Sequence, residues 1–252
     1  MENQVYKNEL LRQLGNSNSP GIREYFNWMY AQVETKISVD STVLEIGAGA
    51  GISKIFMKNS NVVRTDLLNH DIAEVQSGVN AENLPFSNNQ FGAALAVDML
   101  HHTPYPYKVV DELIRVTSAT GKIIIVEPYV SFLSVFFYKL FHSEKTSIFL
   151  KYSPNNPMVG SDAAEGDQVI CQKMFFSKMG RNFYQLNFGS RLTLTRHLIS
   201  PLSFFLTGGI NRPLPISPKV IRFAISAESK IPNPLMKFLA ARQIIVLEKV
   251  AI

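Results

Sequence analysis

Residues 43–51 read VLEIGAGAG, an apolar run that contains one acid, Glu45, and continues into glycines at alternate positions, Gly47, Gly49 and Gly51. The apolar run predicts a short buried strand, and the residues after it predict the start of a helix. Glycines have no side chain, so backbone N–H groups and the amino end of the helix can approach a ligand closely. The stretch therefore predicts a nucleotide-binding site between a strand and a helix.

Three ligand classes compete for such a loop: nucleoside triphosphates, dinucleotides and S-adenosylmethionine. A triphosphate loop needs Lys-Ser/Thr after its second glycine, and no such pair follows here. The dinucleotide pattern G-x-G-x-x-G needs glycine at position 52, where Ile52 stands. A carboxylate at Glu45 would repel a phosphate, whereas S-adenosylmethionine has no phosphate and carries a cationic ammonium and a sulfonium. The loop therefore favours S-adenosylmethionine.

A second acid, Asp66, lies 19 residues after Gly47, at the end of the predicted strand NVVRTD (61–66). A carboxylate at about this distance is placed to grip the hydroxyls of a ribose. This criterion does not separate NAD from S-adenosylmethionine, since both contain ribose. Leu67, next in the chain, would supply an apolar wall for the adenine.

The order E-x-G-x-G-x-G that begins at Glu45 resembles the first motif of the class I S-adenosylmethionine-dependent methyltransferases. Residues 79–106, VNAENLPFSNNQFGAALAVDMLHHTPYP, are similar to the segment that this family carries from its third to its fourth strand. The shared order is a polar residue, Ala-Glu, Leu-Pro-Phe, a turn, a strand and Leu-His-His. The resemblance covers residues 42–128 and is to bacterial methyltransferases of type 11, whose acceptors are uncharacterised.

The resemblance implies that the protein binds S-adenosylmethionine and releases S-adenosylhomocysteine. Glu45 would order the glycine loop or face the ammonium group, and Asp98 would lie near the methionine end of the cofactor. The chain departs from the family at Asn80, where an Asp usually faces the adenine, although an amide oxygen can still accept from the adenine amino group. The implied cofactor-binding residues are Glu45, Gly47, Ala48, Gly49, Asp66, Leu67, Asn80, Ala81, Asp98 and Met99.

Two histidines, His101 and His102, follow the predicted strand 91–100, at the sheet edge where ligands bind in such folds. One interpretation makes His102 a general base for an acceptor hydroxyl; the alternative is that His102 packs or hydrogen-bonds structurally and His101 faces solvent. Glu127 lies at the end of the next predicted strand. It is either a general base or substrate ligand, or a residue that only caps the helix that follows. No metal is expected, because the histidines lack a second ligand pair at suitable spacing and Cys171 is alone.

Apolar strands alternate with helices along residues 41–128, which predicts a parallel sheet covered on both faces. Together with the resemblance, this implies an α/β fold: a Rossmann-like, doubly wound, seven-stranded sheet, mostly parallel, with its last strand antiparallel. Within one domain we expect an N-terminal helical cap (1–40), a cofactor-binding core (41–128), a helical lid or substrate insertion after the fifth strand (129–189), and C-terminal strands and helices that complete the sheet (190–252). Helices are expected near 20–37, 52–60, 106–121, 130–142, 168–180, 217–228 and 233–240, and strands near 42–46, 61–66, 75–79, 91–100, 122–128, 190–197 and 242–250, with a loop at 207–218.

The 252-residue chain is 46% hydrophobic and 18% charged, which suits a globular domain with a real core. Its single cysteine excludes an internal disulfide and fits a reducing compartment. There is no secretory signal, and the longest apolar patch, YVSFLSVFFYKLF (129–141), is too short to span a bilayer. We expect a cytoplasmic protein, with peripheral contact at the inner membrane surface as a further expectation.

Charge and aromatic content divide the chain into two unlike parts. Residues 1–128 carry a net charge of −4 and residues 129–252 a net charge of +9, and 13 of the 17 phenylalanines lie in the second part. The basic, phenylalanine-rich second part leads us to expect an amphipathic or anionic acceptor, a small molecule or a lipid-linked compound such as a saccharide or polyprenyl derivative. We expect the methylated group of this acceptor to be a hydroxyl. Nucleic acid is not an expected partner, because the basic residues are spread and no RNA-binding module is recognisable. The alternative is a non-catalytic module that binds S-adenosylmethionine or a partner protein.

Overall fold

The computed structural model describes residues 2–59, 61–141, 144–160 and 165–250. Its strands are β1 (Val43–Ile46), β2 (Val62–Thr65), β3 (Val75–Gln76), β4 (Phe91–Val97), β5 (Thr117–Pro128), β6 (Leu192–Ile199) and β7 (Arg242–Lys249). Its helices are α1 (Glu2–Asn16), α2 (Pro20–Glu34), α3 (Ser53–Phe56), the 3-10 helix η1 (Leu100–His102), α4 (Pro106–Val116), α5 (Ser134–Phe141), α6 (Ile170–Phe176), α7 (Lys178–Asn187), α8 (Ser203–Thr207), α9 (Pro218–Glu228) and α10 (Asn233–Leu239).

The strands form one seven-stranded sheet in the order β3-β2-β1-β4-β5-β7-β6. Strand β1 pairs in parallel with β2 and β4, and β5 pairs in parallel with β4. Strand β7 runs antiparallel between β5 and β6, with Val246 opposite Ile124 on one side and Thr195 on the other. The expected Rossmann-like sheet, mostly parallel with an antiparallel last strand, is confirmed.

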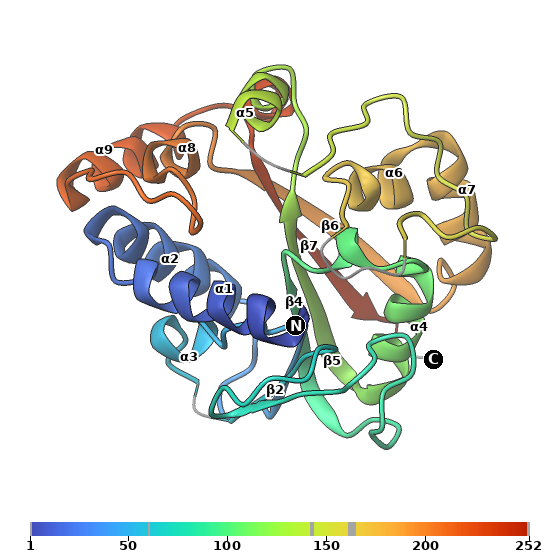
Figure 1. Cartoon of the computed structure of the whole chain (residues 1–252). Coiled ribbons are helices and arrows are strands. Elements are labelled where there is room, and N and C mark those ends of the chain that lie inside the picture. Colours follow the sequence, from blue (N-terminus) through green and yellow to red (C-terminus); the bar gives the residue numbers. More distant parts are fainter. Residues whose placement is uncertain (1, 60, 142–143, 161–164, 251–252) are drawn as a thin grey trace.

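The central strands are buried on both faces, which explains why they read as almost continuous apolar runs. Leu44 and Ala94 face a core that α4, α6 and α7 cover. Their neighbours Val43 and Leu95 point to the opposite face of the sheet and contact a second core that α2 and α9 cover (Figure 1). Because β1, β2, β4 and β5 are parallel, their carboxyl ends meet at one edge of the sheet, where the loops that follow them lie together.

Two sequence-based boundaries differ from the structure. The helix expected over 106–121 ends at Val116, and Gly121 lies inside β5, because Thr117 already pairs with Phe91 of β4. The helix expected over 168–180 is two helices, α6 and α7, separated at Ser177. The Ser177 hydroxyl accepts a hydrogen bond from the Gly180 N–H, so this serine caps a new helix instead of continuing the old one.

Helix α8 was not expected, because five residues are too few to show a helical period. Its amino end is capped by a residue that is distant in the sequence. The Glu228 carboxylate accepts hydrogen bonds from the N–H groups of Leu202 and Ser203. A carboxylate at the amino end of a helix satisfies backbone donors that would otherwise be unpaired. The helix therefore depends on a contact that local sequence does not contain.

Among the described residues, none of the helices combines the length and hydropathy needed to cross a membrane. The apolar patch at 129–141 instead divides into buried and exposed side chains around α5. Ser134 and Tyr138 are buried, whereas Phe132 and Phe136 are 72% and 54% exposed. This segment is thus in part a piece of the core and in part an aromatic surface.

Candidate functional site

The glycine loop between β1 and α3 lies at the carboxyl edge of the sheet. Gly47, Gly49 and Gly51 have φ angles of +60°, +52° and +64°, a left-handed region that other residues enter only with strain. At Gly47 a Cβ atom would also lie 2.7 Å from the Cβ of Met99, which follows β4. The backbone angles therefore favour glycine at all three positions, and at Gly47 the close approach of Met99 also excludes a side chain.

Asp66 ties this loop to the end of β2. Its Oδ2 accepts a hydrogen bond from the Gly49 N–H at 2.7 Å, and its Oδ1 accepts one from the Leu68 N–H at 3.0 Å. The side chain is buried beneath neighbouring residues, while Leu67 beside it is 49% exposed. A carboxylate oxygen has more than one acceptor site, so Asp66 can keep these bonds and still receive further donors.

Helix α1 covers the glycine loop and Asp66. Leu10 is buried against Ala50 of the loop and Ile72, and Lys7 forms an ion pair with Asp71. Burial, together with the nearby charge of Asp66, raises the pKa of the Tyr6 phenol. Figure 1 shows α1 beside α2 on one side of the sheet. The first helix therefore forms one wall of the candidate cofactor site.

Glu45 lies under the loop and does not face outward. The Ser53 hydroxyl donates a hydrogen bond to its carboxylate, and the Arg64 Nε atom lies 3.4 Å from the same oxygen. Arg64 Nε also donates to the Ser53 hydroxyl at 2.7 Å. Burial raises the pKa of Glu45 to about 7, although Ser53 and Arg64 act in the opposite direction. Of its two expected roles, the contacts are those of a residue that orders the loop.

Asn80 and Ala81 follow β3 on the loop toward β4. The Asn80 side-chain oxygen accepts a hydrogen bond from the Glu82 N–H at 2.8 Å, which closes a local turn. Asn80 is exposed, and Ala81 is half-buried against the core. The oxygen that was expected to meet the adenine amino group therefore has one acceptor position engaged within the chain and one left.

Asp98 and Met99 follow β4 directly. Asp98 has a left-handed backbone with φ +51°, and its Oδ1 accepts a hydrogen bond from Nη2 of Arg242 at 2.7 Å. Arg242 is buried; burial lowers its pKa, but the charge of Asp98 raises it further, so that it stays cationic. Arg242 begins β7, 144 residues from Asp98, and local sequence gave no sign of this contact.

Glu127 and His101 form a buried pair at the same edge. Glu127 is fully buried, and its Oε1 accepts hydrogen bonds from the N–H groups of Met99 and Leu100 at 3.2 and 2.7 Å. Its Oε2 lies 2.5 Å from Nδ1 of His101. Burial lowers the pKa of His101, but the charges of Glu127 and Glu144 raise it well above the ordinary value.

His102 differs from His101 in that its Nδ1 atom faces a backbone carbonyl and not a carboxylate. Its Nδ1 lies 3.1 Å from the Glu165 carbonyl oxygen, which can only accept, so Nδ1 carries the proton and Nε2 is the lone pair. Burial and the charge of His101 lower its pKa. His102 is 25% exposed at the side chain and His101 only 2%. The structural alternative was wrong in placing His101 in solvent, because His101 is the more buried histidine. Its other part, a structural hydrogen bond of His102, agrees with the contact to the Glu165 carbonyl.

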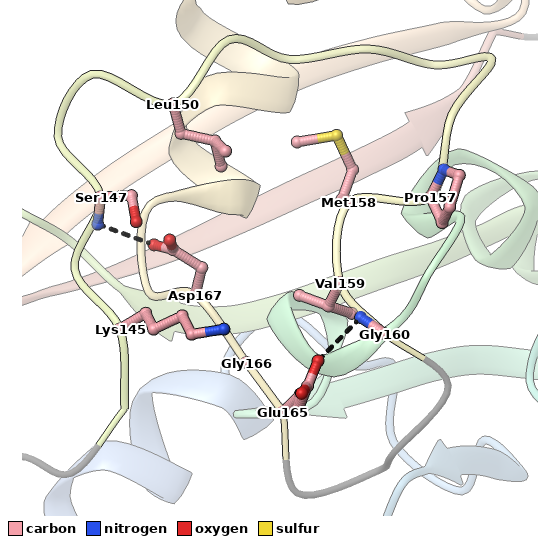
Figure 2. Close-up of a pocket in the computed structure, with 10 residues that line it drawn as sticks. All are labelled: Lys145, Ser147, Leu150, Pro157, Met158, Val159, Gly160, Glu165, Gly166 and Asp167. Carbon is pink, nitrogen blue, oxygen red and sulfur yellow. Dashed lines mark hydrogen bonds between the residues drawn. The ribbon is translucent and has the colours of Figure 1, made fainter.

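A cavity of about 450 Å³ lies next to these histidines, between two parts of the segment that follows β5. Figure 2 shows residues 145–150 along one side of it and residues 157–160 along the other. The Asp167 carboxylate accepts from the Ser147 N–H, and the Glu165 carboxylate accepts from the Gly160 N–H. The lining residues are Lys145, Ser147, Leu150, Pro157, Met158, Val159, Gly160, Glu165, Gly166 and Asp167.

Comparison with known proteins supports the resemblance to methyltransferases that the sequence motifs indicated. The family model described as "Methyltransferase domain" matches residues 44–125. No curated protein sequence matches the chain.

Several solved structures with a similar fold are named as methyltransferases. A SAM-dependent methyltransferase from Archaeoglobus fulgidus has a TM-score of 0.57 at 13% identity, covering 94% of this chain and 98% of its own. One from Thermotoga maritima has a TM-score of 0.52 at 16% identity, covering 96% of each chain. A chain from a complex of the Trm112 methyltransferase activator with a methyltransferase of Haloferax volcanii has a TM-score of 0.53 at 11% identity, covering 98% of each chain. Identities this low show a shared fold.

The raised pKa of Glu45 makes a testable prediction about stability. The folded chain has a Glu45 pKa of about 7 against an ordinary value of 4.5, so between these values it holds a proton that the unfolded chain has lost. The contribution of Glu45 to stability is therefore fully present at low pH and is lost as the pH rises through about 7. Replacing the group by the neutral Glu45→Gln removes this dependence.

We expect the free energy of unfolding of the wild type, minus that of Glu45→Gln, to fall by about 3 kcal/mol between pH 5 and pH 8. Urea denaturation of both proteins at the two pH values measures this difference. Glu34→Gln, at a more exposed glutamate of α2, serves as the control. A difference that is the same at both pH values would show that the buried carboxyl is not shifted.

Proposed function

Residues 44–125 of this chain belong to the class I S-adenosylmethionine-dependent methyltransferases, and from this premise we propose that the protein methylates an acceptor and releases S-adenosylhomocysteine. The observation that carries the proposal is the bond from the Gly49 N–H to Asp66, which joins the glycine loop to a carboxylate at the end of β2. These are the two parts that a nucleoside cofactor needs: bare backbone and a ribose acceptor.

The residues around the loop fit this cofactor. The left-handed glycines present backbone without side chains, and Asp66 has acceptor capacity left for the ribose hydroxyls. We assign Gly47, Ala48 and Gly49 to the backbone of the site, with Leu67, Asn80 and Ala81 toward the adenine. Asp98, held by Arg242, and Met99 would face the methionine end, and Glu45 would support the loop from below.

S-adenosylmethionine supplies an activated methyl group on a sulfonium, so the protein mainly has to align the acceptor and exclude water. We propose that the segment 129–189 binds the acceptor. The cavity beside His102 is lined by Lys145, whose ammonium can bind an anionic group, and by Glu165 and Asp167, whose carboxylates accept hydrogen bonds from backbone N–H groups. Exposed phenylalanines on and before α5 suit an apolar group. These features support an amphipathic or anionic acceptor with a hydroxyl group, such as a saccharide or polyprenyl derivative.

In this proposal the two predicted catalytic residues have different roles. His102 is half-buried, and its Nε2 offers a lone pair at the edge of the sheet, so it is the group that meets the acceptor hydroxyl. Glu127 has both carboxylate oxygens engaged with Met99, Leu100 and His101. It is therefore a positioning residue, which holds η1 and His101 in place.

The rival proposal is a non-catalytic module with this fold. One observation favours it: α1 packs on the glycine loop and leaves Asp66 only 5% exposed. The chain from the Haloferax volcanii complex with Trm112 is a fold neighbour that assembles with a protein, and a protein partner belongs to this rival proposal. Cofactor binding followed by a test of methyl transfer separates the two.

We expect the purified protein to bind S-adenosylmethionine and S-adenosylhomocysteine in titration calorimetry, and Asp66→Ala to weaken both by about 10- to 100-fold. The loss corresponds to about 1.5–3 kcal/mol for hydrogen bonds to a charged group. Asp66→Asn tests the charge with less change in shape, and Asp111→Ala, at an exposed aspartate of α4, is the control. If the wild type binds neither ligand at about millimolar concentration, the enzyme proposal is wrong; unchanged affinity in Asp66→Ala would reject the ribose assignment.

Contact with an anionic inner membrane surface is a further part of this proposal. Phe132 and Phe136 are exposed and in ring contact, with centroids 5.7 Å apart, on the part of the chain that is basic overall. We expect the double variant Phe132→Ser, Phe136→Ser to lose most of its co-sedimentation with anionic vesicles. Phe223→Ser, at a phenylalanine of α9 that is 74% exposed, is the control. If the wild type, the double variant and Phe223→Ser sediment equally, the proposed membrane contact through Phe132 and Phe136 is wrong. If the wild type binds neutral vesicles as well as anionic ones, the preference for an anionic surface is wrong.

A further inference from the structure

His101, His102 and Glu144 bring three potential metal-ligand atoms together at the carboxyl edge of the sheet. One ligand atom from each of these residues lies within 4.8 Å of the other two. Glu144 Oε2 lies 3.2 Å from Nε2 of His101, and Glu144 Oε1 lies 3.9 Å from Nε2 of His102. Ligands at about 2.0–2.2 Å from one tetrahedral ion are themselves about 3.3–3.5 Å apart, so small side-chain rotations suffice.

The Nδ1 atoms of both imidazoles already have hydrogen-bond partners within the chain. Nδ1 of His101 is hydrogen-bonded to the buried Glu127 carboxylate, and Nδ1 of His102 donates to the Glu165 carbonyl. In metal sites a histidine ligand almost always donates its other N–H to a carboxylate or a carbonyl in this way, which fixes the tautomer and the ring orientation. Both Nε2 atoms are thereby turned toward the same partner, Glu144.

The three groups face one another through lone pairs. With both Nδ1 atoms carrying protons, each neutral ring presents its Nε2 lone pair toward the Glu144 carboxylate, whose oxygens also carry lone pairs. A cation between the two Nε2 atoms and Glu144 would accept electron pairs from all three groups.

The buried amide of Gln168 is a second, independent observation at the same place. Gln168 is fully buried, and its Nε2 lies 3.4 Å from Glu144 Oε2. Its Oε1 has no hydrogen-bond partner among the described residues, although a buried amide oxygen is normally satisfied. An acceptor beside Glu144 that lacks a donor is what a water molecule bound to a metal would satisfy.

We propose that His101, His102 and Glu144 bind a divalent transition-metal ion, with Glu127 and the Glu165 carbonyl as the outer shell. Two imidazoles and one carboxylate favour Zn²⁺ or a neighbouring first-row ion over Mg²⁺ and Ca²⁺, which prefer oxygen ligands. Three protein ligands leave an open coordination position, as in catalytic sites. His102 and Glu144 are partly exposed, at 25% and 21%, which gives the ion a path to solvent.

The catalytic role of this ion rests on the proposed methyltransferase function. The cluster directly follows Met99, which packs against Gly47 of the cofactor loop, so an ion here lies next to the expected methyl donor. An acceptor hydroxyl at the open position would become more acidic and release its proton to solvent. Its oxygen would then bond to the methyl carbon while the carbon–sulfur bond breaks and the electron pair returns to sulfur. His102 would serve as a ligand that orients the hydroxyl in place of a base.

The sequence predicted no metal, because only the two adjacent histidines were visible as ligands. Glu144 lies 43 residues after His101 and comes to it through the fold. A direct binding experiment tests the site without any acceptor. The protein is stripped with a chelator, loaded separately with Zn²⁺, Mn²⁺ or Mg²⁺, passed through a desalting column and analysed for metal content, with calorimetry for the dissociation constants.

We expect about one Zn²⁺ per chain and little Mg²⁺, and at least a 100-fold weaker Zn²⁺ affinity in His102→Ala and in Glu144→Gln. Both changes are at partly exposed side chains, and circular dichroism confirms that each variant is folded. His197→Ala, at an exposed histidine of β6, should bind like the wild type. The absorption spectrum of the Co²⁺-loaded protein should report nitrogen and oxygen ligands and change in both variants.

Wild-type protein that retains no metal, or variants that retain as much as the wild type, would overturn the site, and the cluster would then be an ion-pair network held by a proton. The readout is independent of the proposed function. S-adenosylmethionine binding without metal binding rejects this inference alone, and metal binding without S-adenosylmethionine binding rejects the methyltransferase proposal alone.

Discussion

The buried carboxylate of Glu127 is the contact on which the carboxyl edge of the sheet depends. A charge that is fully removed from water is tolerated only when it is hydrogen-bonded and paired, and Glu127 meets both conditions with Met99, Leu100 and His101. These bonds tie the end of β5 to the turn after β4 and so fix the position of Met99. Met99 in turn lies so close to Gly47 that no side chain fits there. One carboxylate thus connects the histidine pair to the glycine loop.

The two oppositely charged parts of the chain meet at this edge. The acidic first part supplies the glycine loop, Asp66 and Asp98, which suit a ligand with a cationic ammonium and a ribose. The basic second part supplies Arg242, whose guanidinium is paired with Asp98 of the first part, and a cavity lined by Lys145, Glu165 and Asp167. At this edge, charges of the second part therefore complete the surroundings of acids of the first part, and the division of charge along the sequence does not persist as a division in space.

Local sequence predicted the features whose cause is local. The glycines needed left-handed backbone, the central strands needed burial on both faces, and Asp66 followed a strand at a ribose-binding distance. It did not predict Arg64 under Glu45, Glu144 beside the histidines or Glu228 at the start of α8. Each of these is a polar partner supplied by tertiary structure, and spacing rules examine only neighbours along the chain.

The antiparallel direction of β7 explains one of these distant partners. A parallel strand would bring its last residue to the carboxyl edge, but β7 brings its first, so Arg242 lies opposite Pro128. From there its guanidinium reaches Asp98, which has a left-handed backbone that costs about 1–2 kcal/mol in a non-glycine residue. A buried arginine needs a carboxylate, and a strained aspartate needs a fixed partner, so each residue offsets the cost of the other. The single strand that runs against the others is therefore what holds Asp98 at the point where β4 leaves the sheet.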